Sequence, residues 1–298
     1  IGRLALTTNT TGANNVAIGC CALKSNTTAS NNVAVGFESL KSNTEGGSNA
    51  AVGTNALTAN TTGSSNNAFG STALDNNTTG SSNTAIGNDA LDANTTASDN
   101  VAVGNGAMFA NTTGCQNTAI GRRALNTNIT GDNNVAVGFC ALKLNTADNN
   151  TAVGFCSLAC NTTGTNQVAF GYQSLTSNTE GNYNNAFGLQ ALQCNTTASD
   201  NTAVGNSAMK LNTTGGNNVA VGNNALVANT TGSNNVAAGK CALCANTEGS
   251  QIIAIGSEAL KSNTTAENNV AVGHRALCAN TTGSANTAVG RQTLSGNI

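Results

Sequence analysis

The 298-residue chain has no proline and no tryptophan, and only 8% of its residues are charged and 3% aromatic. Its net charge of −2 provides no basic surface for nucleic acid or an anionic membrane, so we expect neither partner. No apolar run approaches the roughly 18–20 residues that span a bilayer, so we expect no membrane insertion. The chain begins at Ile1 without a signal-peptide pattern, which suggests a processed or truncated N-terminus and leaves secretion open.

The sequence is instead rich in Asn, Thr, Gly, Ala and Ser, arranged in a short repeat. The stretch NNVAVG occurs four times, at Asn31–Gly36, Asn133–Gly138, Asn217–Gly222 and Asn268–Gly273. The glycine that ends each such segment returns every 17 residues from Gly2 to Gly290, except for one step of 16 from Gly138 to Gly154. The whole chain therefore reads as a single repeat domain, residues 1–298.

Four other columns of the repeat hardly vary when counted from this glycine column. The leucine column lies four residues after it, with Met only at Met108 and Met209, and the asparagine column lies seven after it. The alanine column lies two residues before it, and the valine column, which holds Val, Ile or Phe except at Ala238, lies one before it. A disordered chain does not need a leucine at one fixed phase, so these columns favour a folded array over disorder.

The repeat is too short for two-helix units, which need about 33–47 residues, and its commonest residues are poor helix formers. Asn-Val-Ala-Val-Gly reads as one short strand, Ala-Leu-x-x-Asn-Thr as a second, and Thr-Gly-Ser-Asn as a turn. Such units stack about 4.8 Å apart through parallel backbone pairing. We therefore predict an all-β fold, a parallel β-solenoid (β-roll) of about 17 coils of 17 residues with two short strands per coil.

The columns also predict what each side chain does. We expect the leucine and valine columns to face each other in a dry core and the asparagine column to stack as a ladder of amides. Strand alternation then turns the alanine column outward, either against another copy of the solenoid or into a cramped corner of its own coil. The structural residues that represent these columns are Asn26, Asn43, Asn60, Leu23, Leu40, Leu57, Ala34 and Ala51.

Thirteen copies of the asparagine column read Asn-x-Thr, the acceptor pattern for N-glycosylation. Glycans on neighbouring coils would lie only about 5 Å apart, which is too crowded. The amide ladder is therefore the preferred interpretation.

Ten cysteines are present, and two of them share a column on adjacent coils. Cys140 and Cys156 would have Cα atoms about 5 Å apart, within disulfide range, so we predict a candidate disulfide between them. Cys241 and Cys244 have CxxC spacing, but the intervening Ala-Leu is the repeat consensus and no second pair lies at metal-binding spacing. Three interpretations of the other cysteines are open: free thiols, cross-links between chains, and small buried apolar side chains.

The sequence offers little for catalysis. Its one histidine, His274, lies in a variable column, so no histidine triad or multi-histidine metal site can form within one chain. The 13 acidic residues are scattered, and no glycine-rich loop precedes Lys-Ser/Thr. We expect no enzyme activity, metal or cofactor.

The column directly after the glycine is mostly polar but becomes apolar on four consecutive coils. Two interpretations are open, a contact stripe for another chain or a ligand, and local bracing around the 16-residue repeat. The residues of this stripe are Phe139, Phe155, Tyr172 and Leu189.

The segment Asn14–Gly19 resembles the head repeats of trimeric autotransporter adhesins, which form a left-handed parallel β-roll with three chains to a fibre. The longer segment Asn83–Gly104 is similar to repeats in tail and surface fibres of phages and large viruses. The resemblance implies a fibre, an adhesin or a host contact, and it carries over no catalytic residue.

We therefore expect a structural or adhesive fibre protein, a rigid solenoid segment of a filament at an extracellular or virion surface. Its expected partners are other copies of itself, in a filament or trimer, and a host-surface glycan or protein. The array begins and ends inside a repeat, so we expect either a longer array or ends that dock onto other copies. The alternative is an ice-binding solenoid with Thr ladders, although its paired threonines are adjacent and Glu45, Glu180 and Glu248 interrupt the second Thr column.

Overall fold

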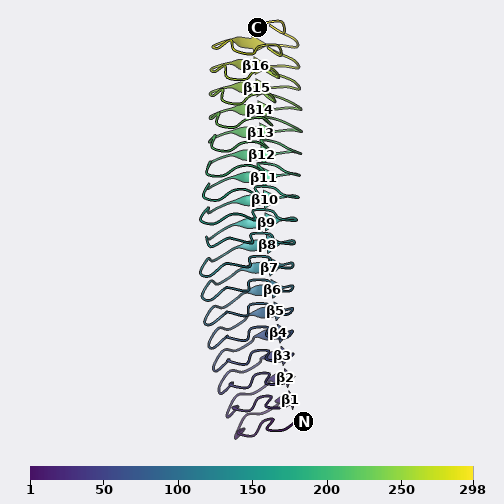
Figure 1. Ribbon diagram of the computed structural model, residues 1–298, viewed down its shortest axis with the longest axis vertical. Coiled ribbons are helices and arrows are strands. Elements are labelled where there is room, and N and C mark those ends of the chain that lie inside the picture. Colours follow the sequence, from purple (N-terminus) through teal and green to yellow (C-terminus); the bar gives the residue numbers. More distant parts are fainter. Residues whose placement is uncertain (298) are drawn as a thin grey trace. The chain divides into compact units, whose positions relative to one another are not determined.

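The computed structural model describes residues 1–297, and within them every regular element is a β-strand. The described residues include no helix of the length and apolarity needed to cross a membrane. The chain divides into two compact units, Ile1–Asn149 and Asn150–Ile298. Each unit is a parallel β-solenoid, in which successive coils place their strands at the same point of the coil (Figure 1). The predicted fold class is confirmed.

Each strand consists of the three residues that precede the glycine column. Unit 1 contains β1 (Val16–Ile18), β2 (Val33–Val35), β3 (Ala50–Val52), β4 (Asn67–Phe69), β5 (Thr84–Ile86), β6 (Val101–Val103), β7 (Thr118–Ile120) and β8 (Val135–Val137). Unit 2 contains β9 (Thr151–Val153), β10 (Val168–Phe170), β11 (Asn185–Phe187), β12 (Thr202–Val204), β13 (Val219–Val221), β14 (Val236–Ala238), β15 (Ile253–Ile255), β16 (Val270–Val272) and β17 (Thr287–Val289).

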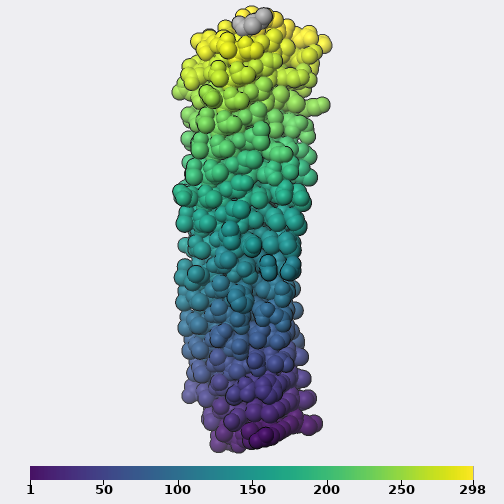
Figure 2. All heavy atoms as spheres, in the orientation of Figure 1, coloured from purple at the N-terminus to yellow at the C-terminus, as the bar shows by residue number. Residues whose placement is uncertain are grey.

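Neighbouring coils pair in strict register. Ala34 of β2 lies beside Ala51 of β3, and the same pairing recurs from β1 to β8 and from β9 to β17. Backbone hydrogen bonds also join the coils outside the strands, as from Leu40 N to the Ala56 carbonyl at 3.0 Å. Within each unit the coils therefore pack closely and follow one another in sequence order (Figure 2).

The predicted second strand is wrong. The residues between the glycine and asparagine columns form turns, and each leucine adopts a left-handed conformation, with φ of 49° at Leu40 and 54° at Leu57. This conformation costs a non-glycine residue roughly 1–2 kcal/mol. The chain rounds a corner there, and the burial of the leucine side chain offsets the cost. Leu23, Leu40 and Leu57 all lie in the core, as predicted.

The predicted core position of the valine column is wrong, and of the two interpretations of the alanine column the structure supports the cramped corner of its own coil. The alanine column, including Ala34 and Ala51, is fully buried, whereas the valine column points to solvent; Ala85 is 0% exposed and Ile86 is 43% exposed. A coil of this length has a narrow interior that already holds a leucine and two asparagine side chains. Only a methyl group fits beside them, so the strand places its alanine inside and its larger residues outside.

The glycine column lies where the coil turns a corner after the strand. Gly53 has φ of 144°, and a Cβ atom there would lie 2.2 Å from the carbonyl oxygen of Gly70 on the next coil. No other residue fits this close approach, which explains why the column does not vary.

Candidate functional site: the outer face of the sheet

The interior contains the amide ladder that the asparagine column predicts. The Nδ2 of Asn43 donates to Oδ1 of Asn26 at 3.1 Å, and that of Asn60 donates to Oδ1 of Asn43 at 2.8 Å. These amides also donate to the carbonyl three residues later, as Asn60 does to Gly63 at 2.9 Å, except that Asn145 in the 16-residue repeat donates to Ala147. The ladder is interrupted at Asn128 in unit 1, where the buried Oδ1 has no hydrogen-bond partner among the described residues. Unit 2 has the same ladder, as from Asn178 Nδ2 to Asn161 Oδ1 at 2.8 Å.

A second buried ladder was missed from the sequence. It consists of the buried asparagines that directly precede the strands. The backbone N–H of Asn49 donates to Oδ1 of Asn32, and that of Asn66 donates to Oδ1 of Asn49. The Nδ2 of Asn49 donates at 2.9 Å to the same Gly63 carbonyl that accepts from the first ladder. The repeat sequence contains the pattern that predicts this ladder, because only Gln167 and Ile252 interrupt the column of asparagines between Asn15 and Asn286.

Because these amides are buried and hydrogen-bonded, they belong to the architecture and not to a binding surface. The same holds for the threonine that follows the asparagine column. Its hydroxyl donates to the next coil's backbone, as Thr61 Oγ1 does to the Thr78 carbonyl at 3.0 Å. The surface available for function is therefore the outside of the sheet and of the turns.

The outer face of the sheet, defined as the first and third residue of every strand, is exposed or half-buried throughout. In unit 1 only Asn67, Thr84 and Thr118 of this face are polar. None of its residues is charged in either unit, although the chain has 24 charged residues, 11 basic and 13 acidic. A row of Val, Ile and Phe side chains thus meets solvent along each sheet without a charge to disfavour association.

In unit 2 aromatic side chains lie on the outer face and beside it. Phe170 and Phe187 stack at a centroid distance of 5.6 Å, and Phe155 and Tyr172 stack at 5.3 Å, each pair within 11° of parallel. Since the rings of each pair face one another, the surface presents mainly their edges. This arrangement suits contact with an apolar protein surface better than stacking of a sugar on a ring face.

The structure places all four residues of the predicted contact stripe at the surface. Phe155, Tyr172 and Leu189 are exposed in unit 2, next to the stacked phenylalanines of the outer face. Phe139 is exposed in unit 1, where the Arg122 guanidinium lies 5.8 Å from its ring centroid. Whether the stripe makes contacts or braces the turn stays a prediction.

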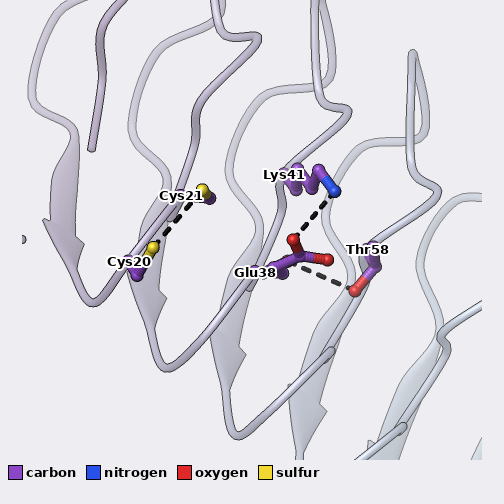
Figure 3. A network of polar contacts seen from close by, with 5 residues as sticks. All are labelled: Cys20, Cys21, Glu38, Lys41 and Thr58. Atoms are coloured by element: carbon purple, nitrogen blue, oxygen red, sulfur yellow. Dashed lines mark hydrogen bonds and ion pairs between the residues drawn. The ribbon is translucent and has the colours of Figure 1, made fainter. Parts of the chain in front are cut away.

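Charged residues gather on the turns, in a polar strip formed by the columns two and five residues after the glycine. Figure 3 shows Lys41 pointing toward Glu38, with Nζ 2.9 Å from Oε1, while the Thr58 hydroxyl donates to the Glu38 carbonyl at 3.2 Å. In the previous coil the Sγ atoms of Cys20 and Cys21 lie 3.5 Å apart, and their hydrogen bond raises the pKa of Cys20.

The same strip holds a row of carboxyl groups. Burial raises the pKa of Asp92 to about 6, with further contributions from the nearby charges of Asp75 and Asp89. Burial also raises the pKa of Asp75. Even so, residues 1–297 contain no cluster of three or more His, Cys, Asp or Glu side chains placed to hold a metal ion.

The predicted disulfide partners lie in different units. Cys140 is buried in unit 1 and Cys156 is partly exposed in unit 2. Their bond stays a prediction.

A scan against protein-family models finds no family that matches this chain, and a search of curated proteins finds no matching relative. The similarity to adhesin heads and fibre repeats therefore rests on the motifs at Asn14–Gly19 and Asn83–Gly104 alone.

Proposed function

We propose that the protein is a structural repeat protein that associates with other copies of itself through the outer face of its sheet. The fold supports a structural role, because the interior is filled with alanine, leucine and amide ladders. The observation that carries the proposal is the row of exposed, uncharged Val, Ile and Phe side chains on that face.

The size of this face favours a partner. The apolar outer-face residues of unit 1 alone expose an area on the order of 500 Å², which approaches the largest patches that monomeric proteins present. Two such faces together would bury on the order of 1,000 Å², the area at which specific interfaces begin.

A second copy is the partner that matches this face best. The outer face of each unit repeats with the coil spacing of about 4.8 Å, and the same unit of another copy has the same spacing. The absence of charge means that two copies place no like charges opposite each other in either orientation. Side-by-side assembly of this kind would thicken and stiffen a fibre.

The setting of such a fibre is part of the proposal. An extracellular or virion surface, with contact to a host, is the setting that the motif resemblance supports. Ice binding has less support, because the threonine column that includes Thr61 and Thr78 donates its hydroxyls to backbone carbonyls. Only the second threonine column is exposed, and Glu45, Glu180 and Glu248 interrupt it. We propose no catalytic activity.

Sedimentation velocity over a range of protein concentrations tests this proposal. The wild-type chain should associate as concentration rises, whereas the variant Ile86→Lys/Ile120→Lys, which places two charges on the outer face, should remain monomeric. The matched control, Thr79→Lys/Thr96→Lys, adds the same charges at exposed turn positions and should associate like the wild type. A monomeric wild-type protein, or an outer-face variant that associates as the wild type does, contradicts the proposal.

A further inference from the structure

A pocket interrupts the polar strip at Gly106. This residue belongs to the coil that follows β6, the strand labelled in Figure 1. In all the remaining coils, the residue two positions after the glycine column has a side chain. Gly106 has φ of 63°, close to the values of 57° at Thr72 and 56° at Arg123 in the same column. A Cβ atom on Gly106 would come no closer than 3.5 Å to its nearest neighbour, Asn126 Nδ2. The fold therefore does not require glycine here.

The missing side chain leaves a hollow of about 290 Å³. Its lining residues are Asp89, Asn105, Gly106, Phe109, Arg123 and Asn126. The volume lies at the small end of ligand sites, which suits one sugar ring better than a longer ligand.

Charges of opposite sign line this pocket from neighbouring coils. Asp89 lies one coil before Gly106 and Arg123 one coil after it, in the same column. Where an acid and an arginine occupy this column on adjacent coils, they pair directly, as Glu258 and Arg275 do at 3.1 Å. At Gly106 the two charges are one coil further apart, and Arg123 makes no ion pair within the described part of the chain.

The other lining groups are held in place. The Thr72 hydroxyl donates to Asp89 Oδ1 at 2.6 Å, and the Asn88 amide donates to Oδ2 of the same carboxylate. Asn126 Nδ2 donates to the Gly106 carbonyl at 2.8 Å. Phe109 is an exposed apolar wall in the same coil.

We propose that this pocket binds a single acidic sugar unit, a pyranose ring that carries one carboxylate. The guanidinium of Arg123 pairs with the carboxylate, for which its forked donors are suited. Asp89 accepts hydrogen bonds from hydroxyls at the other end, and the amide groups of Asn105 and Asn126 serve the remaining hydroxyls. The apolar face of the ring packs on Phe109.

The charge arrangement sets the orientation and the class of the ligand. The carboxylate binds at the Arg123 end because Asp89 and its neighbour Asp92 repel it from the other. An α-amino acid carries its two charges too close together to reach both Asp89 and Arg123 across two coil steps of about 4.8 Å each. This inference goes beyond self-association and concerns a different surface from the outer face of the sheet.

The test is titration of the full chain with glucuronic acid and glucose, followed by calorimetry or ligand-observed NMR. Wild-type protein should bind glucuronic acid at least tenfold more tightly than glucose, and Arg123→Gln should remove that preference. Gly106→Asn should abolish binding without loss of thermal stability, because Asn55 and Asn224 already occupy this column at φ of 58° and 55°.

A matched control opens the same column elsewhere. Asn224→Gly creates a comparable gap between Ser207 and Cys241, which lack the two charges, and should add no binding. The proposal is overturned if the wild-type protein does not bind glucuronic acid, if Gly106→Asn binds it equally well, or if a free amino acid binds more tightly.

Discussion

Asn60 donates a hydrogen bond from its Nδ2 to Oδ1 of Asn43 over 2.8 Å, and its own Oδ1 accepts the same bond from Asn77. All three side chains are fully buried. Each amide therefore has partners on both neighbouring coils, and such chains of hydrogen bonds strengthen one another in a low-dielectric interior. The ladder lets a very narrow core consist partly of polar groups without leaving them unsatisfied.

Replacing Asn60 by alanine should lower the free energy of unfolding by about 2–3 kcal/mol, because it breaks the ladder and leaves the buried Oδ1 of Asn43 without its partner. Denaturant unfolding followed by circular dichroism measures the change. Asn128→Ala is the comparison. It also removes the donor to a ladder neighbour, Asn111 Oδ1, but the Oδ1 of Asn128 itself has no partner among the described residues, so its loss should cost less. Equal losses in the two variants would contradict the role of the ladder.

The glycine column should tolerate no side chain. Gly53→Ala should destabilise the protein by about 3 kcal/mol or more, because the added Cβ would lie 2.2 Å from the Gly70 carbonyl oxygen. Gly106→Ala, at a left-handed position with open space around it, should cost only about 1–2 kcal/mol. Thermal unfolding of both variants checks this, and similar melting temperatures would refute the steric explanation.

Stability should depend on pH through Asp92. Its pKa is raised from 3.8 to about 6 in the folded protein, so between these values the folded state binds more protons than the unfolded state. Stability is therefore highest below pH 4 as far as this group is concerned, and it falls as pH rises through 6. The carboxyl is half-buried and partly screened by solvent, so the loss should be about 1 kcal/mol.

Asp92→Asn should remove this component and raise the melting temperature at pH 7 more than at pH 4. Melting curves of both proteins across this range measure it. A variant with the wild-type pH profile would show that Asp92 does not carry the effect.

Truncation of the two large apolar columns should have unequal effects. Leu91 is fully buried, so Leu91→Ala should cost about 2–5 kcal/mol of stability. Ile86 points outward, so Ile86→Ala should cost less than about 1 kcal/mol at concentrations where the protein is monomeric. Unfolding curves of the two variants decide whether the valine column belongs to the core.

The sequence was sufficient to predict a parallel β-solenoid, because the same 17-residue period is found in every column. A leucine and an asparagine at fixed phase predicted stacked coils, a buried leucine row and the first amide ladder. The strand orientation failed for a specific reason. Alternation shows that Ala85 and Ile86 face opposite ways but does not show which one faces inward. Interior width decides that, and it depends on the whole coil.

Other features had no signal, or a signal that was overlooked. Leu40 gives no hint of its left-handed backbone, because leucine rarely adopts it and the turn around it imposes it. The Gly106 pocket, in contrast, could have been found, since this is the one glycine in its column.

The central claim is that the strand turns its small residue inward and its large residues outward, and residues 252–255 test it most directly. Ile252 is fully buried, whereas Ile253 and Ile255 are exposed. Methyl NMR of isoleucine-labelled protein, at a concentration where it is monomeric, can measure relaxation caused by a soluble paramagnetic reagent. The account predicts strong relaxation of the Ile253 and Ile255 methyl groups and little of Ile252. Protection of Ile255 equal to that of Ile252 would contradict it.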